Sequence, residues 1–107
     1  MPPSTPPPSP EIDPAVRELL AAAGVGPVEV VATLRPPRSG TWRRDQARHA
    51  ADRIVDDTTA AAHEDPERVV VMANIGVVVV RASPAYIGHL MRHELLGTLT
   101  TNRTRPG

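Results

Sequence analysis

Two histidines, His89 and His93, stand four residues apart. On a helix this spacing places both imidazoles on the same side, where they can form a two-ligand metal pair. A catalytic zinc needs a third protein ligand, and the sequence lacks the HExxH order that pairs zinc ligands with a general base. Ile87, Leu90 and Met91 define the packed side of this helix, so His89 is expected on the solvent side. The pair is therefore only a weak candidate for a metal site.

Serine is the other residue type that can carry out catalysis here. Beyond the first thirteen residues the chain has only Ser39 and Ser83, and neither lies in a GxSxG or GxxxxGK[ST] motif. Ser83 precedes Pro84, which is typical of a helix N-cap followed by proline at the first helical position. The sequence thus indicates no catalytic group and no cofactor, and we expect a protein that is not an enzyme.

Composition narrows the classes of partner. The chain has 107 residues, zero formal net charge and no cysteine. A balanced charge gives no broad attraction to nucleic acid, and Trp42 and Tyr86, the only aromatic residues, provide no platform for stacking bases. No apolar stretch approaches the roughly 20 residues that a membrane-spanning helix needs. We therefore expect neither a nucleic-acid partner nor a membrane partner.

The two ends of the chain differ in composition from its middle. Residues 1–13, MPPSTPPPSPEID, are rich in proline and serine and have no periodic apolar pattern, which predicts a disordered leader. The leader lacks a basic start followed by an apolar run, so a cytoplasmic location is the default expectation. Residues 14–102 are expected to form a single α+β domain with its core in 28–102, and residues 103–107 an exposed tail.

Three segments carry helix signals. Helices are predicted over 14–23, from Thr41 to about His63, and from Ser83 to about His93. Asp13, Thr41 and Ser83 are the expected N-caps of these helices. In the long middle segment, small apolar residues recur at helical spacing, which indicates close packing against a sheet.

Four stretches are predicted to be strands. They are residues 28–35, 68–73, 77–82 and 96–102. The first alternates, with Val28 and Val30 on one face and Val31 and Thr33 on the other. Asn-Ile-Gly at 74–76 predicts a tight connection between the two valine-rich strands, because asparagine and glycine tolerate positive φ.

The order of elements from Val28 onward is β-α-β-β-α-β. With short connections, this order predicts a ferredoxin-like sandwich, a four-stranded antiparallel sheet with two helices on one face, plus the short N-terminal helix. The opposite sheet face would carry Val31, Thr33 and alternate valines of the middle strands. Such a face either docks a partner or is covered by the helix at 14–23, and both arrangements are left open.

Three stretches, taken together in this order, resemble the subtilisin propeptide and proteinase-inhibitor family. VEVVATLR at 28–35 is similar to the first strand of the family, and NIGVVVVRASPAYIGHL at 74–90 to its turn, third strand and Ser/Thr-Pro helix start. LGTLTTN at 96–102 resembles the closing strand, in which an apolar residue recurs at every third place before a polar one. The resemblance covers about residues 28–102.

The resemblance implies an inhibitor or folding chaperone of a subtilisin-like serine protease. In that family the sheet packs against helices of the protease, and the C-terminal tail enters the active-site cleft as a substrate mimic. A rigid sheet would lower the ordering cost of a tail that pairs along the cleft. Carried over by position, the protease-binding tail is Thr100, Thr101, Asn102, Arg103, Thr104 and Arg105.

Two other hypotheses stay open, because a fold alone does not imply a function. The first is a non-enzymatic ferredoxin-like interaction or regulatory module, which could form a homodimer through its open sheet face. It predicts that the valine-rich face carries binding. The second is an enzyme, which only the pair His89 and His93 supports. A chain ending at Leu99 separates the hypotheses, since only the inhibitor hypothesis requires the tail.

Overall fold

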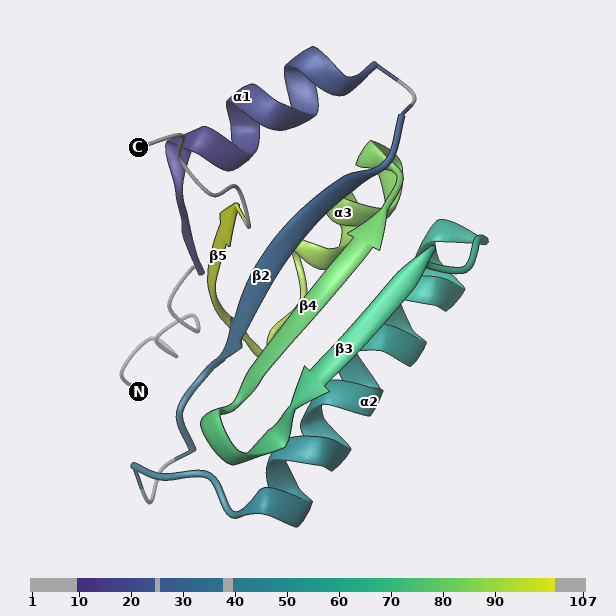
Figure 1. Ribbon diagram of the computed structural model, residues 1–107. Helices are drawn as coiled ribbons and strands as arrows, with labels where there is room; N and C mark the ends of the chain where they lie inside the picture. The colour runs from purple at the N-terminus through teal and green to yellow at the C-terminus, as the bar shows by residue number, and fades with distance from the viewer. Residues whose placement is uncertain (1–9, 25, 38–39, 102–107) are drawn as a thin grey trace, which may run out of the picture.

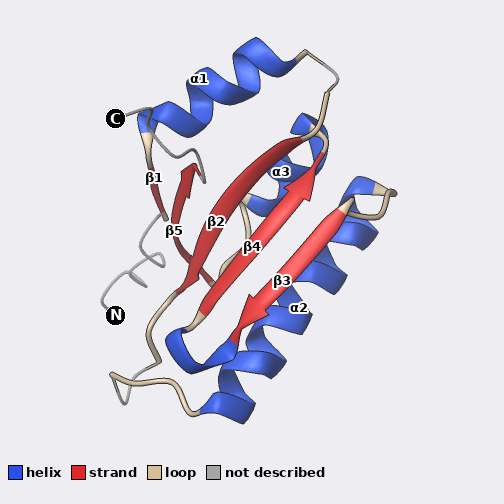
Figure 2. Cartoon of the chain, in the orientation of Figure 1, coloured by secondary structure: helices blue, strands red, loops and turns tan. Residues whose placement is uncertain are grey.

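The computed structural model describes residues 10–24, 26–37 and 40–101, which form a mixed α+β structure (Figures 1 and 2). The helices are α1 (Pro14–Ala23), α2 (Arg44–Ala62) and α3 (Pro84–Leu90), with a single 3-10 turn, η1 (Ala73–Ile75). The strands are β1 (Glu11–Ile12), β2 (Val28–Leu34), β3 (Arg68–Met72), β4 (Val77–Ala82) and β5 (Leu96–Thr101).

The strands form one sheet in the order β1-β5-β2-β4-β3. β2 runs antiparallel to both β4 and β5, and β3 runs antiparallel to β4. The predicted four-stranded antiparallel sheet is wrong in two respects, because the sheet has five strands and β1 pairs with β5 in parallel.

The additional strand lies inside the stretch whose composition predicts a disordered leader. Glu11 and Ile12 pair with Thr98 and Leu99, and the Asp13 N–H donates to the Leu99 carbonyl at 2.9 Å. The prediction is therefore wrong for residues 11–13, while residues 1–9 lie outside the described residues. A two-residue strand has no periodicity of its own, so only the neighbouring strand reveals it.

Two of the three predicted helix starts are confirmed. The Asp13 side chain accepts a hydrogen bond from the Ala15 N–H at 2.9 Å, and Ser83 Oγ accepts one from the Tyr86 N–H at 3.2 Å. The predicted cap at Thr41 is wrong, since α2 begins at Arg44 with no side-chain cap bond. Helix α3 ends at Leu90, three residues before its predicted end. No helix in the described part of the chain combines the length and apolar character that crossing a membrane requires.

Trp42 accounts for the late start of α2. Its ring lies against Gly76, where an added Cβ would stand 3.2 Å from Trp42 Cδ1. Gly76 also has a φ of 64°, a left-handed conformation that favours glycine after the 3-10 turn. The chain therefore places its only tryptophan over the β3–β4 connection before it enters the helix.

The core lies between the sheet and the helices. Buried side chains of β2 and β4 are Val28, Val30, Ala32, Leu34, Val78, Val80 and Ala82. Helix α2 adds Ala47, Ala51 and Ile54, α3 adds Tyr86, Ile87 and Leu90, and α1 adds Val16. The small alanines let α2 approach the sheet closely, as the sequence predicts.

Helix α1 therefore contributes to the same core as α2 and α3. In Figure 1, α1 runs from the end of β1 to the connection that leads into β2, past the end of β5. It does not cross β2, β4 or β3. The alternative in which residues 14–23 cover the opposite face of the sheet is wrong.

A β-bulge at Gly97 explains the apolar spacing of three in the last strand. Thr33 pairs with Thr98 and Leu34 with Leu96, so Gly97 is the additional residue on β5. An added Cβ on Gly97 would lie 3.2 Å from backbone atoms of Arg35. Because the bulge shifts the side-chain alternation, Leu96 and Leu99 both reach the core.

Candidate functional site

The candidate site is the sheet face opposite the helices, here called the open face. Its residues alternate with the buried residues of each strand, and the register of the sheet groups them into three rows across the strands. The charged row is Arg68, Arg81 and Glu29. The valine row is Val70, Val79, Val31 and Thr100, and the mixed row is Met72, Val77, Thr33, Thr98 and Glu11.

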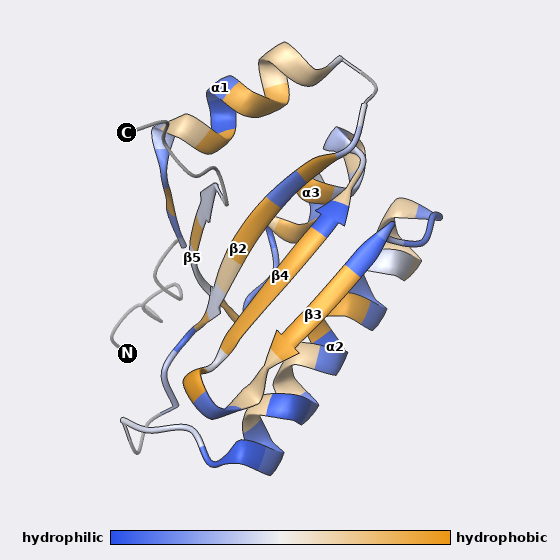
Figure 3. Cartoon of the chain, viewed as in Figure 1, coloured by the Kyte–Doolittle hydropathy of each residue, from blue (hydrophilic) through white to orange (hydrophobic). Residues whose placement is uncertain are grey.

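The two inner rows place apolar side chains next to one another on three strands. Val31, Val70, Met72, Val77 and Val79 are half-buried, although no helix in the described residues lies over them. Figure 3 shows the apolar colour continuing across β2, β4 and β3, with a hydrophilic segment near the upper end of each of these strands. A contiguous apolar patch with a polar border is typical of an interaction surface.

The charged row borders this patch at one end. Arg81 Nε lies 3.0 Å from Glu67 Oε1, which joins β4 to the start of β3. Arg68 and Arg81 stand directly opposite one another, an arrangement of like charges that does not stabilise a sheet. On its other side, Arg81 is opposite Glu29. Both signs of charge therefore occur side by side on the two central strands.

The opposite end of the patch is apolar. The β3–β4 connection carries Ile75, whose exposed fraction is 60 % and which is the one exposed large apolar residue in the described part of the chain. It directly precedes Gly76, and the first residue of β4 follows that glycine. A mostly exposed isoleucine beside a row that contains Met72 and Val77 extends the apolar character of this end.

The structure places only two of the six predicted tail residues. Thr100 and Thr101 belong to β5, where they pair with Val31 and Val30. Asn102, Arg103, Thr104 and Arg105 lie outside the described residues. The sheet therefore continues to Thr101, and a role of these six residues in protease binding stays a prediction.

The two histidines that suggest a metal pair are not on one helix, because α3 ends at Leu90 and His93 follows it. His89 and His93 border a hollow of about 250 Å³ together with Asp57. Among the described residues there is no group of three or more side chains that could hold a metal ion.

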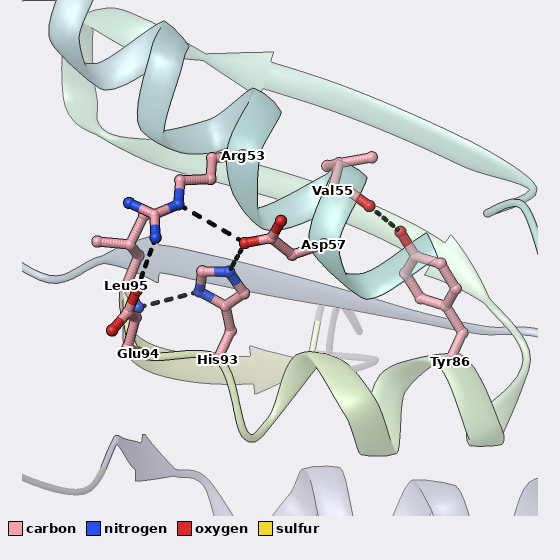
Figure 4. A network of polar contacts seen from close by, with 7 residues as sticks. All are labelled: Arg53, Val55, Asp57, Tyr86, His93, Glu94 and Leu95. Carbon is pink, nitrogen blue, oxygen red and sulfur yellow. Dashed lines mark hydrogen bonds and ion pairs between the residues drawn. The ribbon is translucent and has the colours of Figure 1, made fainter. Parts of the chain in front are cut away.

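His93 instead holds the turn before β5 against α2 (Figure 4). Its Nδ1 accepts a hydrogen bond from the Leu95 N–H at 3.1 Å, and its Nε2 lies 2.8 Å from Asp57 Oδ2. Because Nδ1 accepts from Leu95, the Nε2–H is the group that donates to Asp57. Arg53 continues the network, with contacts of 3.6 Å to Asp57 and 2.9 Å to Glu94.

Tyr86 makes a second link between α2 and α3. Its hydroxyl donates to the Val55 carbonyl at 3.2 Å (Figure 4). The same hydroxyl lies 3.0 Å from Thr59 Oγ1. Burial raises the pKa of Tyr86 above its ordinary value, and the nearby carboxylates of Asp56, Asp65 and Glu64 raise it further against the lowering effect of the Thr59 bond.

Ser83 makes a third link between the same two helices. Its hydroxyl also contacts the carboxylate of Glu64, which follows the end of α2. The hydroxyls of Ser83 and Tyr86 and the ring of His93 thus all hold helices or turns in place. Each has a structural partner.

Sequence alone identifies the open face by Val31, Thr33 and alternate valines, but it misses the charged row. Arg68, Arg81 and Glu29 come from three strands, so only the register between strands brings them into line. The only sequence signal for this row is a charged residue close to each valine run. A charged residue in that position is common near the solvated end of any strand, so it does not predict the row.

Comparisons with family models, with curated proteins and with solved structures found no significant match for this chain.

Proposed function

We propose that the chain is a propeptide-like inhibitor or folding chaperone that binds a subtilisin-like serine protease. Its sheet docks on the protease, and the segment after β5 occupies the active-site cleft. The observation that carries the proposal is the apolar open face, on a sheet whose last strand leads directly into that segment.

The strand order supports the fold that this function implies. Without β1, the order β5-β2-β4-β3 with antiparallel neighbours is that of a ferredoxin-like β-α-β-β-α-β sheet. We propose that β1 and α1 are additions at the β5 edge of this arrangement. They leave the open face available for docking.

The organisation of the sheet suits a binder that presents an extended segment. β5 is hydrogen-bonded to β2 on one side and to β1 on the other, so the strand preceding the tail is held from both sides. A firmly held strand lowers the entropy lost when the following residues pair with a cleft. The binder itself needs no catalytic group.

A second candidate is an interaction module that does not bind a protease cleft. The charged row favours this alternative, because it gives the open face a specific pattern that needs no tail. In this case the open face alone would carry binding.

The test is a titration of a subtilisin-class protease, with hydrolysis of a chromogenic peptide as the readout. The intact chain is compared with a chain ending at Thr101 and with Val79→Glu. Ending at Thr101 is preferable to ending at Leu99, because Thr100 and Thr101 pair with β2. Ala60→Glu, an exposed site on α2, is the matched control for an added carboxylate.

We expect the intact chain and Ala60→Glu to inhibit equally. Removal of residues after Thr101 and the Val79→Glu change should each weaken inhibition by roughly a hundredfold, the loss that a binding hot spot of about 3 kcal/mol gives. Loss with Val79→Glu alone would favour the interaction module. Absence of inhibition by the intact chain, across two or three such proteases, would overturn the proposal.

A further inference from the structure

The open face has a pattern of charge that is complementary to itself. Glu29 and Arg81 stand opposite one another on the two central strands, at the same level along the sheet. One row further, Val31 and Val79 repeat the arrangement with apolar side chains. A two-fold rotation about an axis that runs along the strands, between β2 and β4, exchanges the members of each pair.

We propose that a second copy of this chain docks on the open face, sheet against sheet, about that two-fold axis. The rotation places Arg81 of one copy over Glu29 of the other, and Glu29 over Arg81. It also places Val79 over Val31 in both directions. A closed two-fold dimer requires this kind of self-complementary patch.

Two further pairs of positions are compatible with the same arrangement. At the β3 side, Val70 and Met72 of one copy come over Thr100 and Thr98 of the other, so methyl groups of threonine meet apolar side chains. Sheets that pack face to face keep their strands within about 30° of one another, which preserves this alignment near the axis. The three helices lie outside the interface, since all contribute to the core on the opposite face.

Arg81 can join the interface without releasing its own partner. It contacts Glu67 through Nε at 3.0 Å, and a guanidinium has five N–H donors. Its remaining donors can therefore meet the carboxylate of the second copy. Electrostatic pairing of this type fixes the register of an interface more than it raises affinity.

The size of the patch predicts a weak dimer. Strands about 4.8 Å apart and alternate residues about 6.8 Å apart give a surface of roughly 15 by 15 Å for the apolar part. This is below the about 800 Å² per partner of a standard interface. We therefore expect a monomer and dimer in exchange, with a dissociation constant in roughly the micromolar to millimolar range.

The dimer itself does not depend on the proposed function, but one consequence rests on it. If the open face also docks on a protease, dimer formation and protease binding exclude one another. The dimer would then be a reserve form that dissociates as the protease takes up monomers.

The test is sedimentation equilibrium of the full chain over a wide concentration range, without protease. Arg81→Glu places a carboxylate over Glu29 of the second copy, and Glu29→Arg places a guanidinium over Arg81. Each change should weaken self-association by roughly tenfold or more. An equimolar mixture restores two opposite-charge pairs, so the heterodimer should form within roughly threefold of the wild-type affinity. Ala60→Glu on α2 should associate like wild type.

Methyl NMR of the unaltered chain provides a measurement that needs no variant. On dilution, the signals of Val31 and Val79 should shift, whereas those of Val78 and Val80 in the core should shift much less. A chain that stays monomeric to millimolar concentration would overturn the proposal. So would a dimer that survives both charge changes or a mixture of variants that does not associate. Because none of these readouts includes a protease, a failure here and a failure of inhibition are distinguishable.

Discussion

The two faces of the sheet share their residue types but differ in what covers them. On the helix side, Val30, Val78 and Val80 are completely buried. On the open face, Val31 and Val79 alternate with them and remain half-buried. Neighbouring valines of one strand thus have different roles. Burial against the helices stabilises the fold, whereas the open face retains apolar area that a partner can bury.

This difference shows why a scaffold without an evident catalytic group carries so much β-branched sequence. When a strand is covered on only one side, apolar residues usually alternate with polar ones along it. β5 follows this pattern, with Thr98 and Thr100 on the open face. β3 and β4 use valine on both sides instead. The second set of valines lies outside the core, and we propose that it serves binding.

The largest predicted effect contrasts the two faces directly. Ile54→Ala removes a completely buried side chain of α2, and we expect a loss of about 2–5 kcal/mol in unfolding free energy. Val79→Ala on the open face should cost less than about 1 kcal/mol, because its side chain is already partly exposed and no described helix covers it. Urea denaturation followed by circular dichroism measures both. Equal losses would mean that the two faces do not differ as described.

The second effect concerns the connection at the apolar end of the open face. Gly76→Ala forces a side chain into a left-handed conformation and brings it to 3.2 Å from Trp42. We expect a loss of about 1–3 kcal/mol. The emission of Trp42 should shift to longer wavelength as its ring becomes more exposed. Gly40→Ala is the control, with a positive φ but no atom within 4 Å of the added Cβ.

The third effect tests the link between α2 and α3 through Tyr86. Tyr86→Phe removes its hydroxyl contacts with Thr59 and Val55, and we expect a loss of about 1 kcal/mol in unfolding free energy near neutral pH. The phenyl ring keeps the packing of the phenol, so the variant isolates the hydroxyl. Urea denaturation at neutral pH measures the loss, and a variant as stable as wild type would show that these bonds do not hold the helices together.

The pKa of Tyr86 adds a dependence on pH. Since burial raises the pKa of Tyr86, the unfolded phenol, with a pKa of about 10, ionises first. The contribution of Tyr86 to wild-type stability should therefore be constant below about pH 10 and fall as pH rises toward the folded pKa. The chain has no lysine and no second tyrosine, so Tyr86→Phe should flatten this dependence. The measurement is the denaturant midpoint of wild type and Tyr86→Phe, from about pH 8 to above the ordinary phenol pKa. If the midpoint of the variant fell with pH as steeply as that of wild type, Tyr86 would not be the source of the pH dependence.

The smallest effect is expected at the exposed network around His93. Asp57→Asn removes the charge that contacts Arg53 and His93, but half of the Asp57 side chain is exposed (52 %). We expect a loss of about 1 kcal/mol or less, because exposed ion pairs contribute little. Urea denaturation measures it, with Asp52→Asn on the same helix as the control. A loss as large as that of Ile54→Ala would place this network among the main determinants of the fold.

The main elements of the fold could be predicted from the sequence because their signals are local. The alternation in β2 and the Ser83-Pro84 helix start each lie within a few residues. The features that could not be predicted depend on distant parts of the chain. β1 exists only through its pairing with β5, and α2 begins late because Trp42 packs on Gly76.

The candidate site also has one part that could be predicted from the sequence and one part that could not. The valines of the open face follow from alternation, so the face itself could be predicted. Its charged row depends on the register of three strands, and no single strand reveals that Arg81 stands opposite both Arg68 and Glu29. The prediction that His89 and His93 lie on one helix is wrong, because the helix ends between them.

The most direct test of the central claim measures protease inhibition and stability on the same preparations of wild type, Val79→Glu and Ala60→Glu. We predict that Val79→Glu weakens inhibition of a subtilisin-class protease by roughly a hundredfold, while its unfolding free energy stays within about 1 kcal/mol of wild type. Ala60→Glu should change neither quantity. Undiminished inhibition by a folded Val79→Glu chain would contradict the claim that the open face is the binding surface.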